Sequence, residues 1–121
     1  MQSPGMYSAC EKFCLVVAAD SILLVSRPDT RTKGLVRELK GRPGADELQS
    51  ICGLPLSTYP SSVKLRWMLD HDENVRKAYD EGRLSFGTID TWILYNLNGG
   101  KEAGIHVTDS TNASRTMFVN L

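Results

Sequence analysis

The sequence predicts an α/β protein in which helices predominate, and three observations indicate this class. Residues 14–18 and 22–25 are short apolar runs rich in β-branched side chains, which is typical of buried strands. From residue 29 onward the apolar residues recur instead at helical spacing, and glycines and prolines divide that stretch into segments of helix length. Two further apolar runs, at 105–108 and 117–121, are expected to form short strands around a polar turn.

The first 28 residues leave their local structure open. The runs 14–18 and 22–25 are separated by Ala19-Asp20-Ser21, so two short strands fit the pattern. A single buried helix over the same stretch fits nearly as well, because periodicity does not separate the two for so short a run.

Two helices are expected between residues 29 and 53. Asp29 or Thr30 is suited to cap the first helix, and Gly41 is suited to end it. Pro43 is expected in the first turn of the second helix, where its missing N–H costs no hydrogen bond, and Gly53 is expected to follow the last turn. Their apolar faces are expected to comprise Leu35, Val36, Leu39, Leu48 and Ile51.

Three more helices are expected downstream. One covers residues 61–71, the next covers 72–81 and stops at Gly82, and the last begins after Thr88 and closes at Gly99-Gly100. Their apolar stripes are expected to comprise Val63, Trp67, Val75, Tyr79, Ile89, Trp92, Ile93 and Leu97.

Composition and charge exclude several classes of function. Apolar residues make up 41% of the chain and charged residues 23%, which is the usual globular mixture. Fourteen basic residues balance fourteen acidic ones, so there is no basic footprint for nucleic acid or for a membrane surface. The apolar stretch 13–25 is too short to span a bilayer and lacks the positive region of a signal peptide. We therefore expect a soluble, cytoplasmic chain whose partner is a small molecule or a protein.

The three cysteines do not predict a metal site. Cys10 and Cys14 are four residues apart, but Cys52 is distant, and His71 and His106 have no ligand-type spacing to any of them. Reduced cysteines and no bound metal are the expectation.

Five segments carry a resemblance to a known family. They are Asp29-Thr30-Arg31-Thr32, Gly53-Leu54-Pro55, the stretch from Tyr59 to His71, Phe86-Gly87-Thr88-Ile89-Asp90-Thr91-Trp92, and Thr111-Asn112-Ala113-Ser114-Arg115-Thr116. In this order and spacing they resemble the glycerol kinase branch of the FGGY sugar-kinase family. The resemblance covers residues 29–121, which are therefore expected to be a partial FGGY kinase N-terminal domain. Residues 1–28 are expected to be a divergent leader.

The resemblance implies a fold and a reaction. Such kinases have two RNase H-like domains of the actin and hexokinase type with a cleft between them, so this chain is expected to be a helix-rich, incomplete N-terminal domain. The implied reaction is phosphorylation of glycerol to glycerol 3-phosphate by ATP with Mg²⁺.

The resemblance also implies roles for single residues. Tyr59 corresponds to an aromatic contact of the polyol, and a phenol supplies both an apolar wall and one O–H group for a substrate hydroxyl. Lys64 has the length to reach a phosphate, although a solvated helix lysine is the commoner outcome. Trp67 and Trp92 are expected in the core, and Arg115 is a candidate to face anionic ligands.

The departures from the family pattern are equally informative. Nothing before Asp29 resembles the phosphate-binding turn of glycerol kinases, their Arg-Glu pair is missing, and Arg27 stands where they have tryptophan. The catalytic aspartate and the second domain would lie beyond Leu121. We therefore expect a truncated chain that is inactive alone, has no catalytic residue of its own, and binds neither ATP nor Mg²⁺ tightly. The alternative is a non-catalytic interaction module that pairs with a full-length kinase subunit through its apolar helical stripes.

Overall fold

The structure is a computed structural model that describes residues 13–18, 21–26 and 29–120. Its centre is a three-stranded sheet in the order β2-β1-β3, formed by β1 (Phe13–Ala18), β2 (Ser21–Ser26) and β3 (Leu84–Thr88). β1 pairs antiparallel with both neighbours, with Cys14 opposite Val25 on one side and opposite Thr88 on the other. The first apolar runs thus form two strands rather than one helix, and the third strand arrives from much later in the chain.

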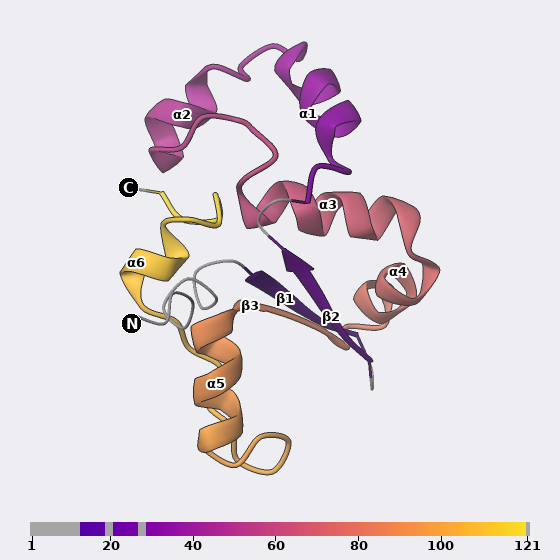
Figure 1. Cartoon of the computed structure of the whole chain (residues 1–121), viewed down its shortest axis with the longest axis vertical. Helices are drawn as coiled ribbons and strands as arrows, with labels where there is room; N and C mark the ends of the chain where they lie inside the picture. Colours follow the sequence, from indigo (N-terminus) through magenta and orange to yellow (C-terminus); the bar gives the residue numbers. More distant parts are fainter. Residues whose placement is uncertain (1–12, 19–20, 27–28, 121) are drawn as a thin grey trace, which may run out of the picture.

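Six helices lie above this sheet and at its two ends in the described part of the chain (Figure 1). They are α1 (Lys33–Lys40), α2 (Glu47–Cys52), α3 (Ser61–His71), α4 (Glu73–Asp80), α5 (Ile89–Leu97) and α6 (Ser110–Ala113). Figure 1 shows α3 crossing above the sheet, α1 and α2 beyond it, α4 at one end, and α5 extending away from the other end with α6 nearby.

Two helix starts differ from the prediction. α1 begins at Lys33 with Thr32 at its N-cap, because the Asp29 carboxylate accepts hydrogen bonds from Arg31 instead of from the helix. α2 begins at Glu47 rather than near Pro43, because Gly44 has a φ of 81°, which cannot be part of a right-handed helix. Pro43 therefore lies in the turn that precedes α2.

The helix ends follow the sequence closely. Gly41 caps α1, and Gly53 has a φ of 68° after α2, a left-handed conformation that favours glycine. α3 has the predicted bounds, and α4 is capped by Asp72, whose side chain accepts from the backbone N–H groups of Asn74 and Val75.

The core consists of two clusters that share α3. One cluster lies between the sheet, α3 and α4 and contains Val25, Met68, Val75 and Ala78. The other lies between α1, the loop before α3, and α3 itself, and contains Val36, Leu56 and Val63 with Met117 packed against them. Because α3 supplies side chains to both clusters, it holds the two parts of the molecule together.

Several predicted apolar stripes are exposed. Tyr79, Ile93 and Leu97 are 56%, 42% and 78% exposed, and Leu48 and Ile51 are also exposed, while Ala78 and Cys52 are buried in their helices. The strands predicted at 105–108 and 117–121 are wrong for the described residues, since residues 105–109 are irregular, residues 114–117 form a turn and residues 118–120 form no strand. Among the residues described, no helix is long and apolar enough to cross a bilayer.

Candidate functional site

The carboxyl ends of β2 and β3 point to the same edge of the sheet, where the start of α3 also lies (Figure 1). In open α/β folds, ligands commonly bind outside the carboxyl ends of strands, because the loops that follow the strands converge there. Three groups of residues lie at this edge of the sheet.

The first group surrounds Tyr59. This residue lies directly before Pro60, which is completely buried and has an extended backbone, and α3 starts at the residue after Pro60. Tyr59 is partly exposed, and its backbone N–H donates to Ser57 Oγ over 3.3 Å. The buried proline thus fixes the chain just after a tyrosine whose ring is neither in the core nor fully in solvent.

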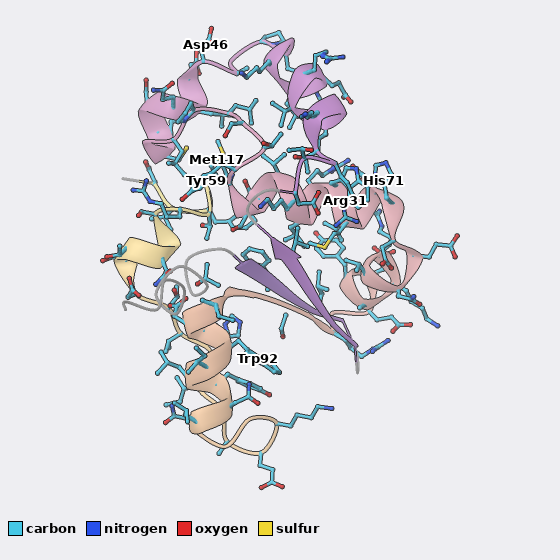
Figure 2. All side chains as sticks on the ribbon, viewed as in Figure 1. Arg31, Asp46, Tyr59, His71, Trp92 and Met117 are labelled. Carbon is cyan, nitrogen blue, oxygen red and sulfur yellow. The ribbon has the colours of Figure 1, made fainter. Side chains whose placement is uncertain are left out.

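The C-terminal segment meets Tyr59's neighbours. The N–H of Ser62, in the first turn of α3, donates to the carbonyl oxygen of Thr116 over 3.0 Å. Figure 2 shows Tyr59 and Met117 at the place where these two segments meet. Met117 has a φ of 64° and packs onto the cluster of Val36, Leu56 and Val63.

The second group is a hydroxyl and carboxylate network where β3 passes into α5. Asp90 Oδ1 accepts from the Thr88 hydroxyl, and Asp90 Oδ2 accepts from the Thr108 hydroxyl over 2.6 Å. The Thr91 hydroxyl lies 3.5 Å from that of Thr88, and both side chains are buried. Gly87 is required beside them, because a Cβ atom there would come within 2.8 Å of the Thr91 side chain.

A cavity of about 200 Å³ adjoins this network. Its wall is mainly apolar, with Phe86 and Phe118 in edge-to-face contact at 5.2 Å, and its polar groups come from threonines and a histidine. The residues that line it include Phe86, Thr88, Thr91, His106, Thr116 and Phe118. Tyr59 does not line this cavity, although Thr116 connects the two regions through Ser62.

The third group follows β2. The Asp29 carboxylate accepts from Arg31 Nε at 2.8 and 3.0 Å, and this bond together with the Arg31 charge holds the pKa of Asp29 below its ordinary value. The Arg31 guanidinium lies 4.6 Å from the ring centre of Trp67, which in turn stacks on His71 at 4.4 Å. Lys64 is buried and its charge also lowers the pKa of Asp29, so the expectation of a solvated lysine is wrong.

The other predicted residues differ in their burial. Trp67 is partly buried and packs against the core cluster that contains Val25, whereas Trp92 is partly buried and stacks on Tyr95. Arg115 is exposed and donates to Ser114 Oγ. Cys52 is buried and its thiol donates to the carbonyl of Leu48, while Cys10 lies outside the described residues.

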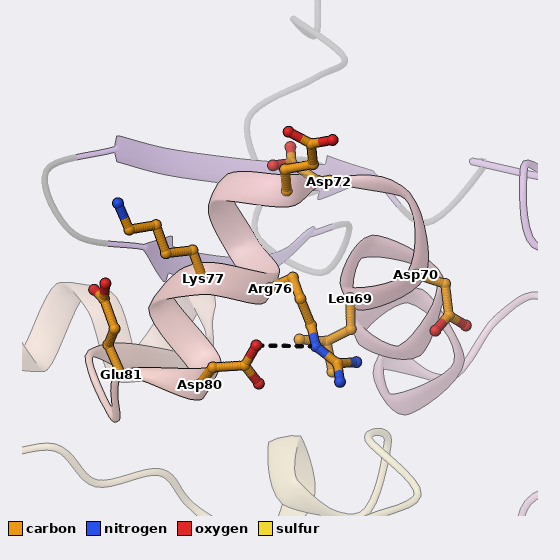
Figure 3. Close-up of a pocket in the computed structure, with 8 residues that line it drawn as sticks. Leu69, Asp70, Asp72, Arg76, Lys77, Asp80 and Glu81 are labelled. Carbon is orange, nitrogen blue, oxygen red and sulfur yellow. Dashed lines mark hydrogen bonds and ion pairs between the residues drawn. The ribbon is translucent and has the colours of Figure 1, made fainter.

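A groove of about 410 Å³ between α3 and α4 is rich in carboxylates, most of which bind other groups of this chain (Figure 3). Asp80 pairs with Arg76, Asp70 pairs with Arg66, and Asp72 caps α4. In the described ranges, no group of three or more His, Cys, Asp or Glu side chains is placed to hold a metal ion.

The chain is similar to known carbohydrate kinases. Residues 22–121 match the N-terminal domain of the FGGY family of carbohydrate kinases. The chain is 53% identical over 93 residues to the glycerol kinase of Brucella anthropi, an alignment that covers 77% of this chain and 19% of that protein. It is 50% identical over 93 residues to the glycerol kinase of Beutenbergia cavernae, covering 77% of this chain and 18% of that protein.

A solved structure agrees with these relatives. The crystal structure of Plasmodium falciparum glycerol kinase with ADP matches 92% of this chain and 22% of its own, with a TM-score of 0.81 and 27% identity. The expected fold class is therefore confirmed as part of an RNase H-like domain of the actin and hexokinase type. The chain spans about a fifth of the length of the relatives that it matches.

Proposed function

This chain belongs to the FGGY family of carbohydrate kinases, and we propose that it forms part of the N-terminal domain of a glycerol kinase. The proposed reaction of the whole enzyme is transfer of the γ-phosphoryl group of ATP to a terminal hydroxyl of glycerol, which yields glycerol 3-phosphate. The identity of about one half to glycerol kinases over 77% of the chain carries this proposal. The same relation supports a cytoplasmic location.

Tyr59 is the residue that we assign to the polyol. Its ring is partly exposed, and its position is set by buried Pro60 on one side and by the Ser62–Thr116 hydrogen bond a few residues later. A phenol in such a place offers an apolar face to the carbon chain of glycerol and one O–H group to a hydroxyl. Support for the role comes from this geometry together with the resemblance of the segment from Tyr59 to His71.

We assign no described residue to ATP or to Mg²⁺. Phosphoryl transfer requires a phosphate cradle, a metal ion and a carboxylate beside the attacking hydroxyl. The carboxylates at the sheet edge instead bind this chain's own groups, since Asp29 holds Arg31 and Asp90 holds Thr88 and Thr108. ATP and Mg²⁺ therefore belong to the proposed reaction of the whole enzyme.

The 121-residue chain alone is expected to be inactive. With ATP, Mg²⁺ and glycerol in a coupled assay for ADP, we expect no rate above the control without enzyme. A reproducible rate that scales with chain concentration and requires glycerol would contradict this expectation.

A transplant tests the assignment of Tyr59. The matched 93-residue segment of this chain would replace its counterpart in the Brucella anthropi glycerol kinase, which it resembles at 53% identity. We expect the chimera to phosphorylate glycerol, and Tyr59→Ala to raise KM for glycerol roughly 10- to 30-fold, because it removes one hydrogen bond and an apolar wall. Tyr59→Phe should cost less, since the wall remains.

Tyr79→Ala is the matched control, because Tyr79 is exposed on α4, and α4 lies at the opposite end of the sheet (Figure 1). If Tyr59→Ala leaves the KM for glycerol of a well-folded chimera unchanged, Tyr59 is not part of the polyol site. A well-folded chimera without activity would contradict the proposed function itself.

A second candidate function rests on exposed apolar side chains. Ile93, Leu94 and Leu97 on α5 are exposed, as are Ile105 and Val107 in the loop that returns beside α5 (Figure 1). Such a face suits a non-catalytic module that pairs with a full-length kinase subunit. Co-purification with an intact kinase at fixed stoichiometry would favour this interpretation, and a polydisperse aggregate would count against it.

A further inference from the structure

Residues 108–117 link two parts of the sheet edge that are far apart in sequence. We call this segment the 108–117 strap. It starts at the β3–α5 junction, contains α6, and ends against the first turn of α3. The strap is therefore anchored at both of its ends by other elements of the fold.

Asp90 holds the first end of the strap. Its Oδ2 atom accepts from the Thr108 hydroxyl over 2.6 Å and from the Asp109 N–H over 3.4 Å, while Oδ1 accepts from the Thr88 hydroxyl. Because Thr88 ends β3 and its side chain is buried, the carboxylate ties the strap to the sheet. A carboxylate accepts through both oxygens, so Asp90 can serve β3 and the strap at the same time.

The middle of the strap is rigid by local hydrogen bonding. The Asp109 carboxylate accepts from the N–H groups of Thr111 and Asn112 at 2.7 and 2.9 Å, which caps α6. After α6, the Thr116 hydroxyl donates to the Ala113 carbonyl over 2.7 Å and accepts from the Phe118 N–H over 3.1 Å. These bonds connect the end of the strap at Thr108 to its end at Thr116 through α6.

The second end of the strap holds the start of α3. The Thr116 carbonyl accepts from Ser62 N–H over 3.0 Å, and Met117 packs against the core cluster that contains Leu56 and Val63, which precede and follow Pro60 in the sequence. These contacts flank the stretch that carries Tyr59.

We propose that Asp90 is a positioning residue for Tyr59, which acts by holding the 108–117 strap against the first turn of α3. The effect of Asp90 on glycerol binding rests on the proposed function. The coupling from Asp90 to Ser62 through the strap does not depend on that function. Asp90 itself is not assigned any contact with substrate.

The test measures hydrogen exchange and tyrosine ring signals by NMR on the full 121-residue chain. The readout is the protection of Ser62 N–H divided by that of Gly53 N–H, which bonds to the Gln49 carbonyl at the end of α2. In Asp90→Ala, we expect this ratio to fall about tenfold, because a charge-assisted hydrogen bond has been lost at the far end of the strap. The ring signals of Tyr59 should shift, and Asp90→Asn should restore part of both effects.

Asp72→Ala is the matched control. Asp72 also accepts from two backbone N–H groups at a helix start, so its loss destabilises the chain in a similar way, but it makes none of the strap's bonds. The Ser62 ratio should stay at the value of the unsubstituted chain. If Asp90→Ala does not fold, Thr108→Val supplies the same test, because it removes only an exposed hydroxyl from the strap.

The outcomes separate the two proposals. An unchanged Ser62 ratio in both Asp90→Ala and Thr108→Val, or an equal fall in Asp72→Ala, overturns the role of Asp90. A glycerol titration followed on the Tyr59 signals reads the proposed function independently. If glycerol shifts no Tyr59 signal while Asp90→Ala still lowers the Ser62 ratio, Tyr59 does not contact the polyol, but the coupling through the strap is supported.

Discussion

Val75 is the most deeply buried residue of the larger core cluster. It is 0% exposed and packs with Val25, Met68 and Ala78 between the sheet, α3 and α4. Val75→Ala removes two buried methyl groups and leaves a cavity, so we expect a loss of about 1–3 kcal/mol in the free energy of unfolding. Urea denaturation followed by circular dichroism measures it.

Tyr79→Ala is the natural comparison on the same helix. Its side chain is 56% exposed, so truncation should change the free energy of unfolding by less than about 0.5 kcal/mol. Equal losses for the two variants would mean that α4 packs through a different face.

Asp29 and Arg31 give the chain an acid-sensitive contact. The Arg31 side chain donates to Asp29 and keeps the pKa of that carboxyl below its ordinary value of about 3.9. The folded state thus binds the proton less readily than the unfolded state. The resulting stability is present above the ordinary pKa and is lost as the pH falls through the lower folded-state pKa.

The pH dependence of unfolding tests this contact. We expect Asp29→Asn to flatten the decline in stability below about pH 4, as measured by urea unfolding at a series of pH values. Arg31→Gln should flatten it similarly, because it removes the donor that lowers the pKa. Curves parallel to that of the unsubstituted chain would exclude the contact as a source of acid sensitivity.

At the scale of single elements, a glycine inside α1 and a glycine just after α4 should respond in opposite ways to alanine. Gly34 lies inside α1, and an added Cβ atom would meet nothing within 4 Å, so Gly34→Ala should stabilise by up to about 1 kcal/mol. Gly82 has equal room, but its φ is 67°, and Gly82→Ala should destabilise by about 1 kcal/mol. Thermal unfolding of the two variants, measured side by side, checks the contrast.

Helix signals were readable because they are local. The ends of α3 and α4, the glycine after α2 and the start of α5 each depend on residues within one or two turns. β3 was not predicted, because it forms by pairing with β1 far back in the chain. Ile105, Val107 and Thr108 have β-branched side chains, yet the Thr108 hydroxyl bonds to Asp90 and no strand is formed there.

The candidate site likewise combines residues that local sequence indicates with residues that only the fold brings together. The resemblance of one contiguous segment suggested Tyr59 as a candidate, and that role stays a proposal. The Asp90–Thr108 bond joins residues 18 positions apart across a helix and a loop, and no local pattern links them. The buried state of Lys64 depends likewise on where the chain after β2 passes, which helical periodicity does not indicate.

For the molecule as a whole, the core is divided. Its two clusters are joined mainly through α3, and several large apolar side chains on α5 and in the following loop are exposed. Ordering each residue costs roughly 1–2 kcal/mol of backbone entropy, which each cluster has to offset through its own buried side chains. We therefore expect a broad, weakly cooperative thermal transition for the 121-residue chain.

Differential scanning calorimetry checks this expectation. A van't Hoff enthalpy well below the calorimetric enthalpy would show that the two clusters unfold separately. A sharp two-state transition at about 45–65 °C, as in ordinary mesophilic domains, would contradict it.

The central strand of the sheet has a consequence for the order of events during synthesis. β1 can pair with β2 as soon as both have been synthesised. Its other edge can pair only after β3 has been synthesised, because Thr88 of β3 is the partner of Cys14. Pairing between strands so far apart in the sequence slows folding, since a long loop must close before the pairing contributes any stability. On the ribosome, the open edge of β1 stays unpaired until residue 88 has emerged from the exit tunnel, so the nascent chain is most exposed to mispairing during that interval.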